Sequence, residues 1–186
     1  MALEVKQPGR RLTAFWDGTK EGSGTGPPVL QRGMMVTMNG KASADLGLNL
    51  NYAGVHTPRF ARTGDPLVTI AATGWSTARQ VFPVNKILFK REDADLTSDT
   101  ITSGEYLILY DGGEYETDRY GTIHINADYG WPLYVDANGK LTTVTGSPNN
   151  RPVAIFISSG ASFDSDYHAA SMIWFRMIPS TLHGNS

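Results

Sequence analysis

The segment of residues 130–157 constrains the fold of this chain most strongly, because it predicts a β-hairpin followed by a third strand. Two β-prone apolar runs, 133–135 and 141–144, are separated by five residues that include Asn138 and Gly139. Both of these residues can adopt the positive φ that a tight hairpin turn demands. The segment offers no nucleophile, metal cage or phosphate-binding loop, so we interpret it as a structural unit.

Short β-prone runs separated by glycine and proline recur along the chain. The 186 residues include 20 glycines and 10 prolines, a mixture that favours short strands joined by turns over packed helices. Two strongly apolar runs, 153–157 and 171–178, are typical of strands covered on both faces. Asn-Gly at 39–40 predicts a second hairpin turn, and 111–114 predicts another turn. Further strand candidates are residues 34–38, 46–52, 67–70, 86–90, 106–110 and 122–126. The sequence therefore predicts a mainly β fold, a sandwich or barrel-like domain of short antiparallel strands.

A four-residue pattern, Gly-Xaa-Pro-Leu before a β-prone run, occurs twice, at 64–67 and at 130–133. It indicates either a weak internal repeat or the same way of starting a strand from a turn. If it is a repeat, the body consists of two similar β halves that meet near residue 120.

Residues 1–32 are predicted to form an extended N-terminal arm, and residues 33–186 the β-rich body. The stretch 17–28 is rich in glycine, serine, threonine and proline, a composition typical of a flexible tether. The strand signals begin only near Gly33.

Four residues of this arm are candidates for contacts with another protein. Phe15 and Trp16 either pack in the chain's own core or anchor the arm on a neighbouring subunit, since aromatic residues are favoured interface anchors. Arg10 and Arg11 give the same segment a basic bias. If the arm docks on another protein, we expect all four to contact a neighbouring subunit or the assembly to which the chain binds.

Composition excludes several classes of function. The net charge is −2, from 16 basic and 18 acidic residues, so no basic surface predicts nucleic-acid binding. The chain has no cysteine, which excludes disulfides, thiol catalysis and cysteine-bound zinc. No apolar run is long enough to span a membrane, and the N-terminus lacks the apolar segment of a signal peptide. We expect a soluble protein made in a cytoplasm.

The titratable residues predict no catalytic, cofactor or metal site. The chain has four histidines, and none of them has the spacing of a helical metal site: His56, His124, His168 and His183. We expect His124 on a strand face. A Ser165, His168 and Asp164 or Asp166 set lacks the Gly-Xaa-Ser-Xaa-Gly motif that exposes a catalytic serine.

Acidic and aromatic residues leave weaker alternatives open. The acidic group Asp111, Glu114, Glu116 and Asp118 is more typical of a solvated turn than of a calcium site. Glu105, Glu114 and Glu116 offer the carboxylates that a glycosidase needs. Tryptophans stack on sugars in lectins but more often fill cores; the chain has Trp16, Trp75, Trp131 and Trp174.

The C-terminal part of the chain resembles the head decoration (cement) proteins of tailed bacteriophages. The similarity rests on three blocks: Gly-Trp-Pro-Leu-Tyr-Val at 130–135, the Asn138-Gly139-Lys140 turn with the following Leu-Thr-Thr, and Arg-Pro-Val-Ala-Ile-Phe-Ile at 151–157. A final strand at 172–178 follows. The resemblance covers about the last 60 residues well.

The resemblance implies a structural virion protein on the outer capsid surface that clamps neighbouring major capsid subunits. It implies a homo-oligomer (dimer or trimer), with no enzyme activity, cofactor, nucleic acid or membrane as partner. Two alternatives remain: a carbohydrate-binding or hydrolysing module of a phage fibre, and a tail or neck structural protein.

Overall fold

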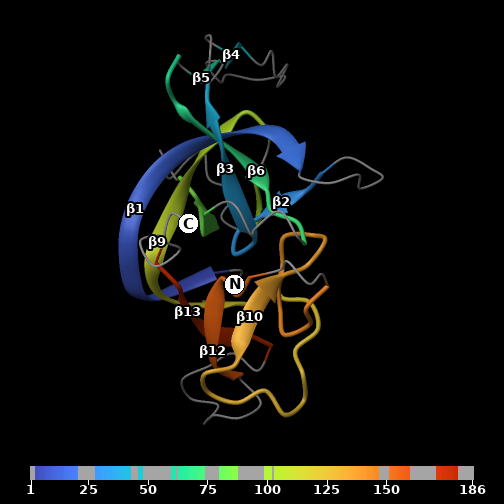
Figure 1. Cartoon of the computed structure of the whole chain (residues 1–186). Coiled ribbons are helices and arrows are strands. Elements are labelled where there is room, and N and C mark those ends of the chain that lie inside the picture. The colour runs from blue at the N-terminus through green and yellow to red at the C-terminus, as the bar shows by residue number, and fades with distance from the viewer. Residues whose placement is uncertain are drawn as a thin grey trace.

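The structure is a computed structural model. This structure describes residues 3–20, 28–42, 46–47, 60–61, 63–73, 80–87, 99–101, 103–146, 151–159 and 171–179. These residues form strands and no helix (Figure 1), which confirms the mainly β, sandwich or barrel-like fold class. The strands are β1 (Leu3–Lys20), β2 (Leu30–Gln31), β3 (Met35–Lys41), β4 (Leu46–Gly47), β5 (Phe60–Ala61), β6 (Pro66–Ile70), β7 (Val81–Lys86), β8 (Thr100–Ile101), β9 (Glu105–Thr117), β10 (Pro132–Val135), β11 (Leu141–Thr142), β12 (Ala154–Ser159) and β13 (Ile173–Met177).

Nine strands form one mixed sheet in the order β1-β6-β3-β7-β9-β13-β12-β10-β11. Because β1 also pairs with β9, the first five strands of this order close into a barrel. The β1–β6 pairing is parallel and the other pairings of the sheet are antiparallel. In Figure 1 the barrel strands β3 and β6 lie above, and β10, β12 and β13 lie below. The long strands β1 and β9 connect the two parts.

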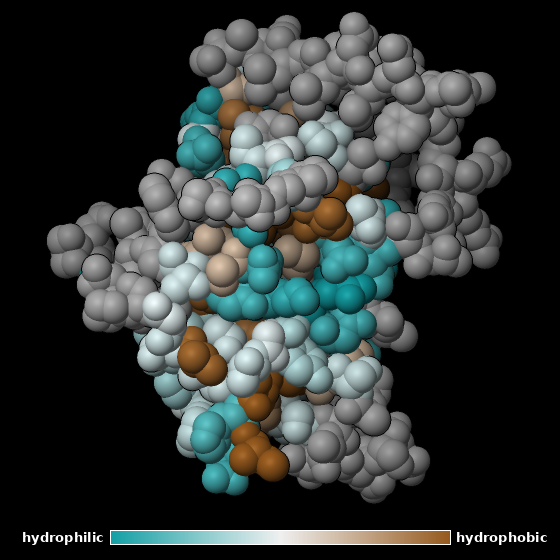
Figure 2. Space-filling view, turned by 90° about the vertical axis from the view of Figure 1, so that its right-hand side faces the viewer, coloured by the Kyte–Doolittle hydropathy of each residue, from teal (hydrophilic) through white to brown (hydrophobic). Residues whose placement is uncertain are grey.

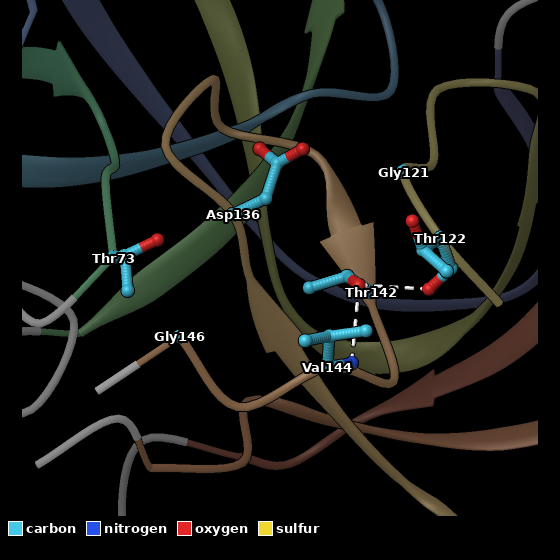
Figure 3. A pocket seen from close by; sticks show the side chains of 7 residues that line it. All are labelled: Thr73, Gly121, Thr122, Asp136, Thr142, Val144 and Gly146. Atoms are coloured by element: carbon cyan, nitrogen blue, oxygen red, sulfur yellow. Dashed lines mark hydrogen bonds between the residues drawn. The ribbon is translucent and has the colours of Figure 1, made fainter. Parts of the chain in front are cut away.

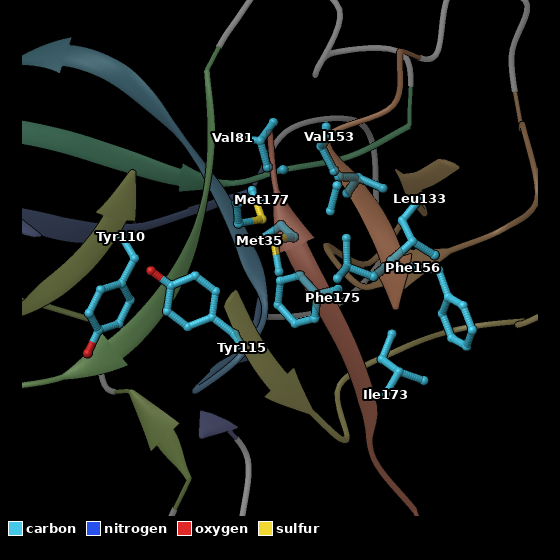
Figure 4. Close-up of a cluster of buried hydrophobic side chains, with 14 of the residues drawn as sticks. Met35, Val81, Tyr110, Tyr115, Leu133, Val153, Phe156, Ile173, Phe175 and Met177 are labelled. Atoms are coloured by element: carbon cyan, nitrogen blue, oxygen red, sulfur yellow. The ribbon is translucent and has the colours of Figure 1, made fainter. Parts of the chain in front are cut away.

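Buried apolar side chains form two large groups. The barrel core lies inside the five barrel strands and consists of Ala14, Trp16, Leu30, Met34, Val36, Val68, Ile70, Phe82, Val84, Ile101, Leu107 and Leu109. The sheet core is drawn in Figure 4 and includes Tyr110, Tyr115, Leu133, Phe156, Ile173, Phe175 and Met177. Both groups draw on strands β1 or β3 and on β9, so they do not divide the chain at residue 120.

The N-terminal segment is extended, as predicted, but lies inside the sheet. Strand β1 pairs with β9 from Leu3 to Trp16 and with β6 from Phe15 to Lys20. Phe15 is 0% exposed and Trp16 is 2% exposed. The Phe15 ring meets the Tyr106 ring edge-on at 5.2 Å, and the Trp16 indole N–H donates to the Thr19 carbonyl oxygen at 2.9 Å. Both aromatic residues therefore pack in the chain's own core, and the boundary at residue 33 does not separate an arm from the body in this part.

The turn predicted at 111–114 is wrong, because β9 continues through it. Gly112 and Gly113 take φ values of 74° and 93°, and the paired strand β1 passes them at Gly9. A Cβ on Gly9 would lie 2.3 Å from the Gly112 carbonyl oxygen, so only glycine fits there. The buried Tyr115 hydroxyl accepts the Gly9 N–H at 2.9 Å and donates to the Gly112 carbonyl at 2.7 Å. The glycines thus permit an irregular, close pairing of two strands, and Figure 1 shows how strongly β1 curves.

The hairpin turn predicted at Asn39-Gly40 is also wrong. Both residues lie within β3, and the register with β6 shifts between Met38 and Lys41. Gly40 has a φ of 101°, which is typical of the glycine in a β-bulge. Gly40 therefore has the positive φ that the Asn-Gly pair predicts, but it lies in a bulge of a continuing strand and not in a hairpin turn.

Three further strand predictions have different outcomes. Of the strand expected at 86–90, Lys86 is the last residue of β7, Ile87 has no regular structure, and residues 88–90 lie outside the described residues; β7 contains Pro83, a residue that argues against a central strand in sequence. Residues 122–126 form a loop, so His124 is not on a strand. Within 46–52, only Leu46–Gly47 lies in the described residues, as β4.

The last strands alternate between buried and more exposed side chains. In β13, Ile173, Phe175 and Met177 are buried and Arg176 is exposed, and β12 alternates in a similar way. The prediction that both strands are covered on both faces is therefore wrong. One face of each packs on the sheet core.

The hairpin of residues 130–157 is confirmed as β10 and β11, with β12 as the third strand. Gly139 has a φ of 74° and donates its N–H to the Asp136 carbonyl oxygen. The two Gly-Xaa-Pro-Leu segments share their local structure: Gly64 and Gly130 have φ values of 93° and 94°, and a strand starts at the proline in each. This agrees with the interpretation that both are the same way of starting a strand from a turn.

Candidate functional site

The connection from β9 to β10 contains the ordered loop 121–131, which has no regular secondary structure. Backbone bonds tie it to its surroundings: Gly121 N–H donates to the Leu141 carbonyl at 2.8 Å, and Gly130 N–H to the Phe156 carbonyl at 2.9 Å. Ile123 and Ala127 pack against the sheet core. The loop is therefore preformed by the fold.

Two aromatic rings stack at the surface of this loop. The His124 and Trp131 rings lie 5.3 Å apart, with an angle of 28° between their planes. The ring nitrogen Nδ1 of His124 accepts the Asn126 backbone N–H at 3.1 Å, and the backbone N–H of His124 donates to the Thr143 hydroxyl at 2.8 Å. The bond to Nδ1 orients the imidazole. The Trp131 side chain that stacks on it is 37% exposed.

Exposed large apolar side chains concentrate on and beside this loop. We call Ile125, Tyr129, Trp131 and Val144 the exposed apolar surface; they are 95%, 64%, 37% and 52% exposed. Elsewhere in the described part of the chain, the other such residue is Val29. Figure 2 shows apolar patches amid polar residues on the lower half of the face where the 118–146 loops lie in Figure 1. Because exposed large apolar side chains can mark interaction sites, this surface is the candidate recognition site in the described part of the chain.

A hollow of about 330 Å³ lies between the start of this loop and the β10–β11 hairpin (Figure 3). It is lined by Thr73, Gly121, Thr122, Asp136, Thr142, Val144 and Gly146. Asp136 Oδ1 accepts the Asn138 and Lys140 N–H groups at 2.7 and 2.9 Å, which holds the carboxylate in place. The Thr142 hydroxyl donates to the Thr122 carbonyl at 2.7 Å. The lining is rich in hydroxyl groups and contains one carboxylate and no cation.

The acidic group expected in a solvated turn lies instead along β9 and just after it, and each member has a basic neighbour. Asp111 pairs with Arg10 at 3.2 Å, Glu114 with Arg176 at 2.8 Å, Glu116 with Lys6 at 3.3 Å, and Asp118 with Arg119 at 3.3 Å. In the described residues, no three acidic or histidine side chains are placed to hold a metal ion. The group is an ion-pair network across β1, β9 and β13.

The surroundings of two of these cations shift their pKa values. Burial alone would lower the pKa of Lys6, but the hydrogen bonds and negative charges of Glu4 and Glu116 raise it overall. The hydrogen bond and charge of Glu114, with a smaller contribution from Tyr129, raise the pKa of Arg176. Both cations stay charged, which keeps the pairs intact at neutral pH.

The carboxylates proposed for glycoside hydrolysis are not arranged for it. Glu105 and Glu114 lie near opposite ends of β9, roughly 25–30 Å apart along an extended strand, against about 5–9.5 Å in glycosidases. Glu114 and Glu116 are close in sequence, but both are ion-paired and Glu116 is 1% exposed. A substrate cannot reach them both.

The remaining predicted residues divide between the core, the surface and the undescribed segments. Arg10 and Arg11 are exposed on β1; the Arg11 guanidinium lies 5.9 Å from the centre of the Tyr110 ring. Trp174 is half-buried on β13. His56, Trp75, Asp164, Ser165, Asp166, His168 and His183 lie outside the described residues. The exposed loop was not predicted because residues 122–126, which include Ile125, were assigned to a strand.

Comparison of the chain with protein-family models, with curated proteins and with solved structures found no significant match. The described part of the chain contains no helix with the length and apolar character needed to cross a bilayer.

Proposed function

We propose that this chain is a structural virion protein that binds the outer surface of a bacteriophage capsid and clamps neighbouring major capsid subunits. The observation that carries the proposal is the exposed apolar surface on the ordered loop 121–131. Aromatic and large apolar side chains exposed together are the usual centre of a protein–protein contact.

The arrangement of this surface suits a contact that must form at low entropic cost. The loop is held by backbone hydrogen bonds and by Ile123 and Ala127 against the sheet core, so little ordering is needed on binding. It adjoins β10, β11 and β12, the segment in which the chain resembles decoration proteins. Asp111, Glu114 and Glu116 of β9 are engaged in ion pairs, in keeping with a structural role for these carboxylates.

Oligomerisation and a polar contact complete the proposal. A homo-oligomer that touches several capsid subunits gains avidity that a single weak contact lacks. Arg10, whose side chain is 69% exposed, and Arg11 remain the predicted polar contacts with a capsid or a neighbouring subunit. Phe15 and Trp16 are not available for this role while β1 lies in the sheet.

The test is co-sedimentation of the purified protein with heads of the phage that encodes it. Tyr129→Ala should weaken binding by roughly thirtyfold if it is a hot-spot aromatic worth about 2 kcal/mol. Ile125→Ser should weaken it as well, whereas Val29→Ser, an exposed apolar residue outside this surface, should not. Equal binding by the parent, Tyr129→Ala and Ile125→Ser would refute this contact.

A reconstruction of the virion locates the chain directly. Density for this fold on the outer face of the head supports a decoration protein. Density in the tail or neck would replace the proposal with the structural alternative from that part of the particle.

A further inference from the structure

The hollow beside the loop has the hydrogen-bonding character of a site for a polyhydroxylated ligand. Thr73, Thr122 and Thr142 bring hydroxyl groups to its wall, and Asp136 brings a carboxylate. Its volume of about 330 Å³ lies at the lower end of the range for small-ligand sites, about 300–1,000 Å³. The Thr73 and Thr142 hydroxyls donate their hydrogens to the Val135 and Thr122 carbonyl oxygens, so the wall mainly accepts: a ligand's hydroxyl groups can donate to the Asp136 carboxylate and to the lone pairs of the threonine hydroxyls.

Two glycines keep this hollow open. A Cβ on Gly121 would lie 2.8 Å from Asp136 Oδ2, and a Cβ on Gly146 would lie 2.9 Å from Thr73 Cγ2. A larger residue at either position would therefore press against the polar wall. The Asp136 carboxylate is held from its other oxygen, Oδ1, by two backbone N–H groups, so its orientation is preset.

Two short connections link the stacked aromatic pair to residues that line the hollow. Thr122 lines the hollow, and His124, two residues later, stacks on Trp131. On the other side, Thr142 and Val144 line the hollow, and Thr143 between them accepts the His124 N–H. A ligand that fills the hollow and extends past His124 can thus reach an exposed indole.

We propose that this surface is a carbohydrate-binding site for a neutral glycan. The C–H face of a sugar ring is apolar and packs on an aromatic ring such as Trp131, while its hydroxyls hydrogen-bond to Asp136 and the threonines. Acidic sugars are disfavoured, because the lining holds a carboxylate and no cation to compensate a second negative charge. The site shares Trp131 and Val144 with the exposed apolar surface of the proposed capsid contact, whereas Gly121 and Asp136 belong to the hollow alone, so substitutions at these two positions test glycan binding separately from capsid binding.

The experiment begins with the full chain on a glycan array that contains neutral and sialylated or uronic-acid glycans. The best neutral oligosaccharide is then titrated by calorimetry into the parent and three variants. Trp131→Ala, Asp136→Asn and Gly121→Ala should each weaken binding by about tenfold or more, which corresponds to about 1.4 kcal/mol. Asp136→Asn preserves an oxygen that can accept the turn's N–H groups, so the hairpin should stay folded.

Control measurements separate glycan binding from folding and from the capsid contact. Thr13→Val, an exposed threonine on β1, should bind the glycan as the parent does. Melting curves of all variants identify any that are unfolded, and Trp131→Phe should retain most of the binding because it retains an aromatic face. Gly121→Ala should still co-sediment with heads, so failure of one proposal is visible apart from failure of the other.

Three outcomes would overturn the site. These are no binding to any neutral glycan at millimolar concentration, a preference for acidic glycans, or equal glycan affinity in the folded parent, Gly121→Ala and Asp136→Asn.

Discussion

Replacing Tyr115 with phenylalanine tests whether the irregular pairing of β1 and β9 holds the two parts of the fold together. The Tyr115 side chain is 0% exposed and packs near Tyr110 and Phe175, with ring centres 5.1 and 5.8 Å away. Phenylalanine preserves this packing and removes only the hydroxyl that bridges Gly9 N–H and the Gly112 carbonyl.

The expected loss follows from the two groups left without this partner. A buried donor or acceptor deprived of its partner costs about 1–3 kcal/mol. Gly112 is buried, whereas Gly9 is half-buried and can partly rehydrate, so the free energy of unfolding should fall by roughly 2–3 kcal/mol. For a chain of this length each kcal/mol lowers the melting temperature by about 2–4 °C, so the expected drop is about 4–12 °C.

The pH dependence gives a second readout of the same hydroxyl. Burial raises the pKa of Tyr115 from 10.0 to about 12. The folded state then retains a proton that the unfolded state loses between pH 10 and 12, so this contribution to stability is complete below pH 10 and is lost as pH rises through 12. The difference in free energy of unfolding between the parent and Tyr115→Phe should therefore become smaller above pH 10.

Calorimetry and urea denaturation at pH 7 and above pH 10 measure both effects. Tyr134→Phe, a half-buried tyrosine on β10, is the control and should change stability by about 0.5 kcal/mol or less. If Tyr115→Phe melts within about 2 °C of the parent, the bridging hydroxyl does not stabilise the junction and the reasoning is wrong.

Other substitutions test the remaining structural inferences. Gly139→Val should cost about 2 kcal/mol or more in urea denaturation, because φ is 74° and its Cβ would lie 2.7 Å from Ile70 Cγ2; parent-like unfolding would contradict the turn assignment. Trp16→Ala should lower the free energy of unfolding by about 3–5 kcal/mol in thermal melts, since it empties part of the barrel core; an unchanged melting temperature would instead favour the interpretation that Trp16 anchors an arm on a neighbouring subunit. Gly113→Ala should destabilise far more than Gly112→Ala, because the new Cβ would lie 2.4 Å from the Tyr115 hydroxyl in the first and 3.5 Å from its nearest neighbour in the second; equal unfolding midpoints would argue against the close pairing.

Local turn chemistry could be predicted from the sequence because it depends on a few adjacent residues. Asn138 and Gly139 marked the β10–β11 hairpin correctly, and the prolines after Gly64 and Gly130 marked where two strands start. The mainly β class followed from the same short-range signals, since glycine and proline interrupt the apolar runs too often for packed helices.

The setting of other glycines depended on a partner strand that lies far away in sequence. Gly40 and Gly112 favour positive φ, but that preference is shared by hairpin turns and bulges. Only the pairing of β3 with β6, and of β1 with β9, decides that the strand continues through both positions and does not turn back.

The sequence by itself determined the class of fold and the places where the chain can turn, because those follow from local backbone preferences. Tertiary structure alone decided the role of the N-terminal segment and of the candidate site. Pro8 and Gly9 interrupt the pattern of β1, so its pairing with β9 over Leu3 to Trp16 and the burial of both aromatics arise from long-range contacts. The exposure of the loop 121–131 has the same origin: whether an apolar side chain is buried depends on which strands surround it, and no short stretch of sequence contains that information.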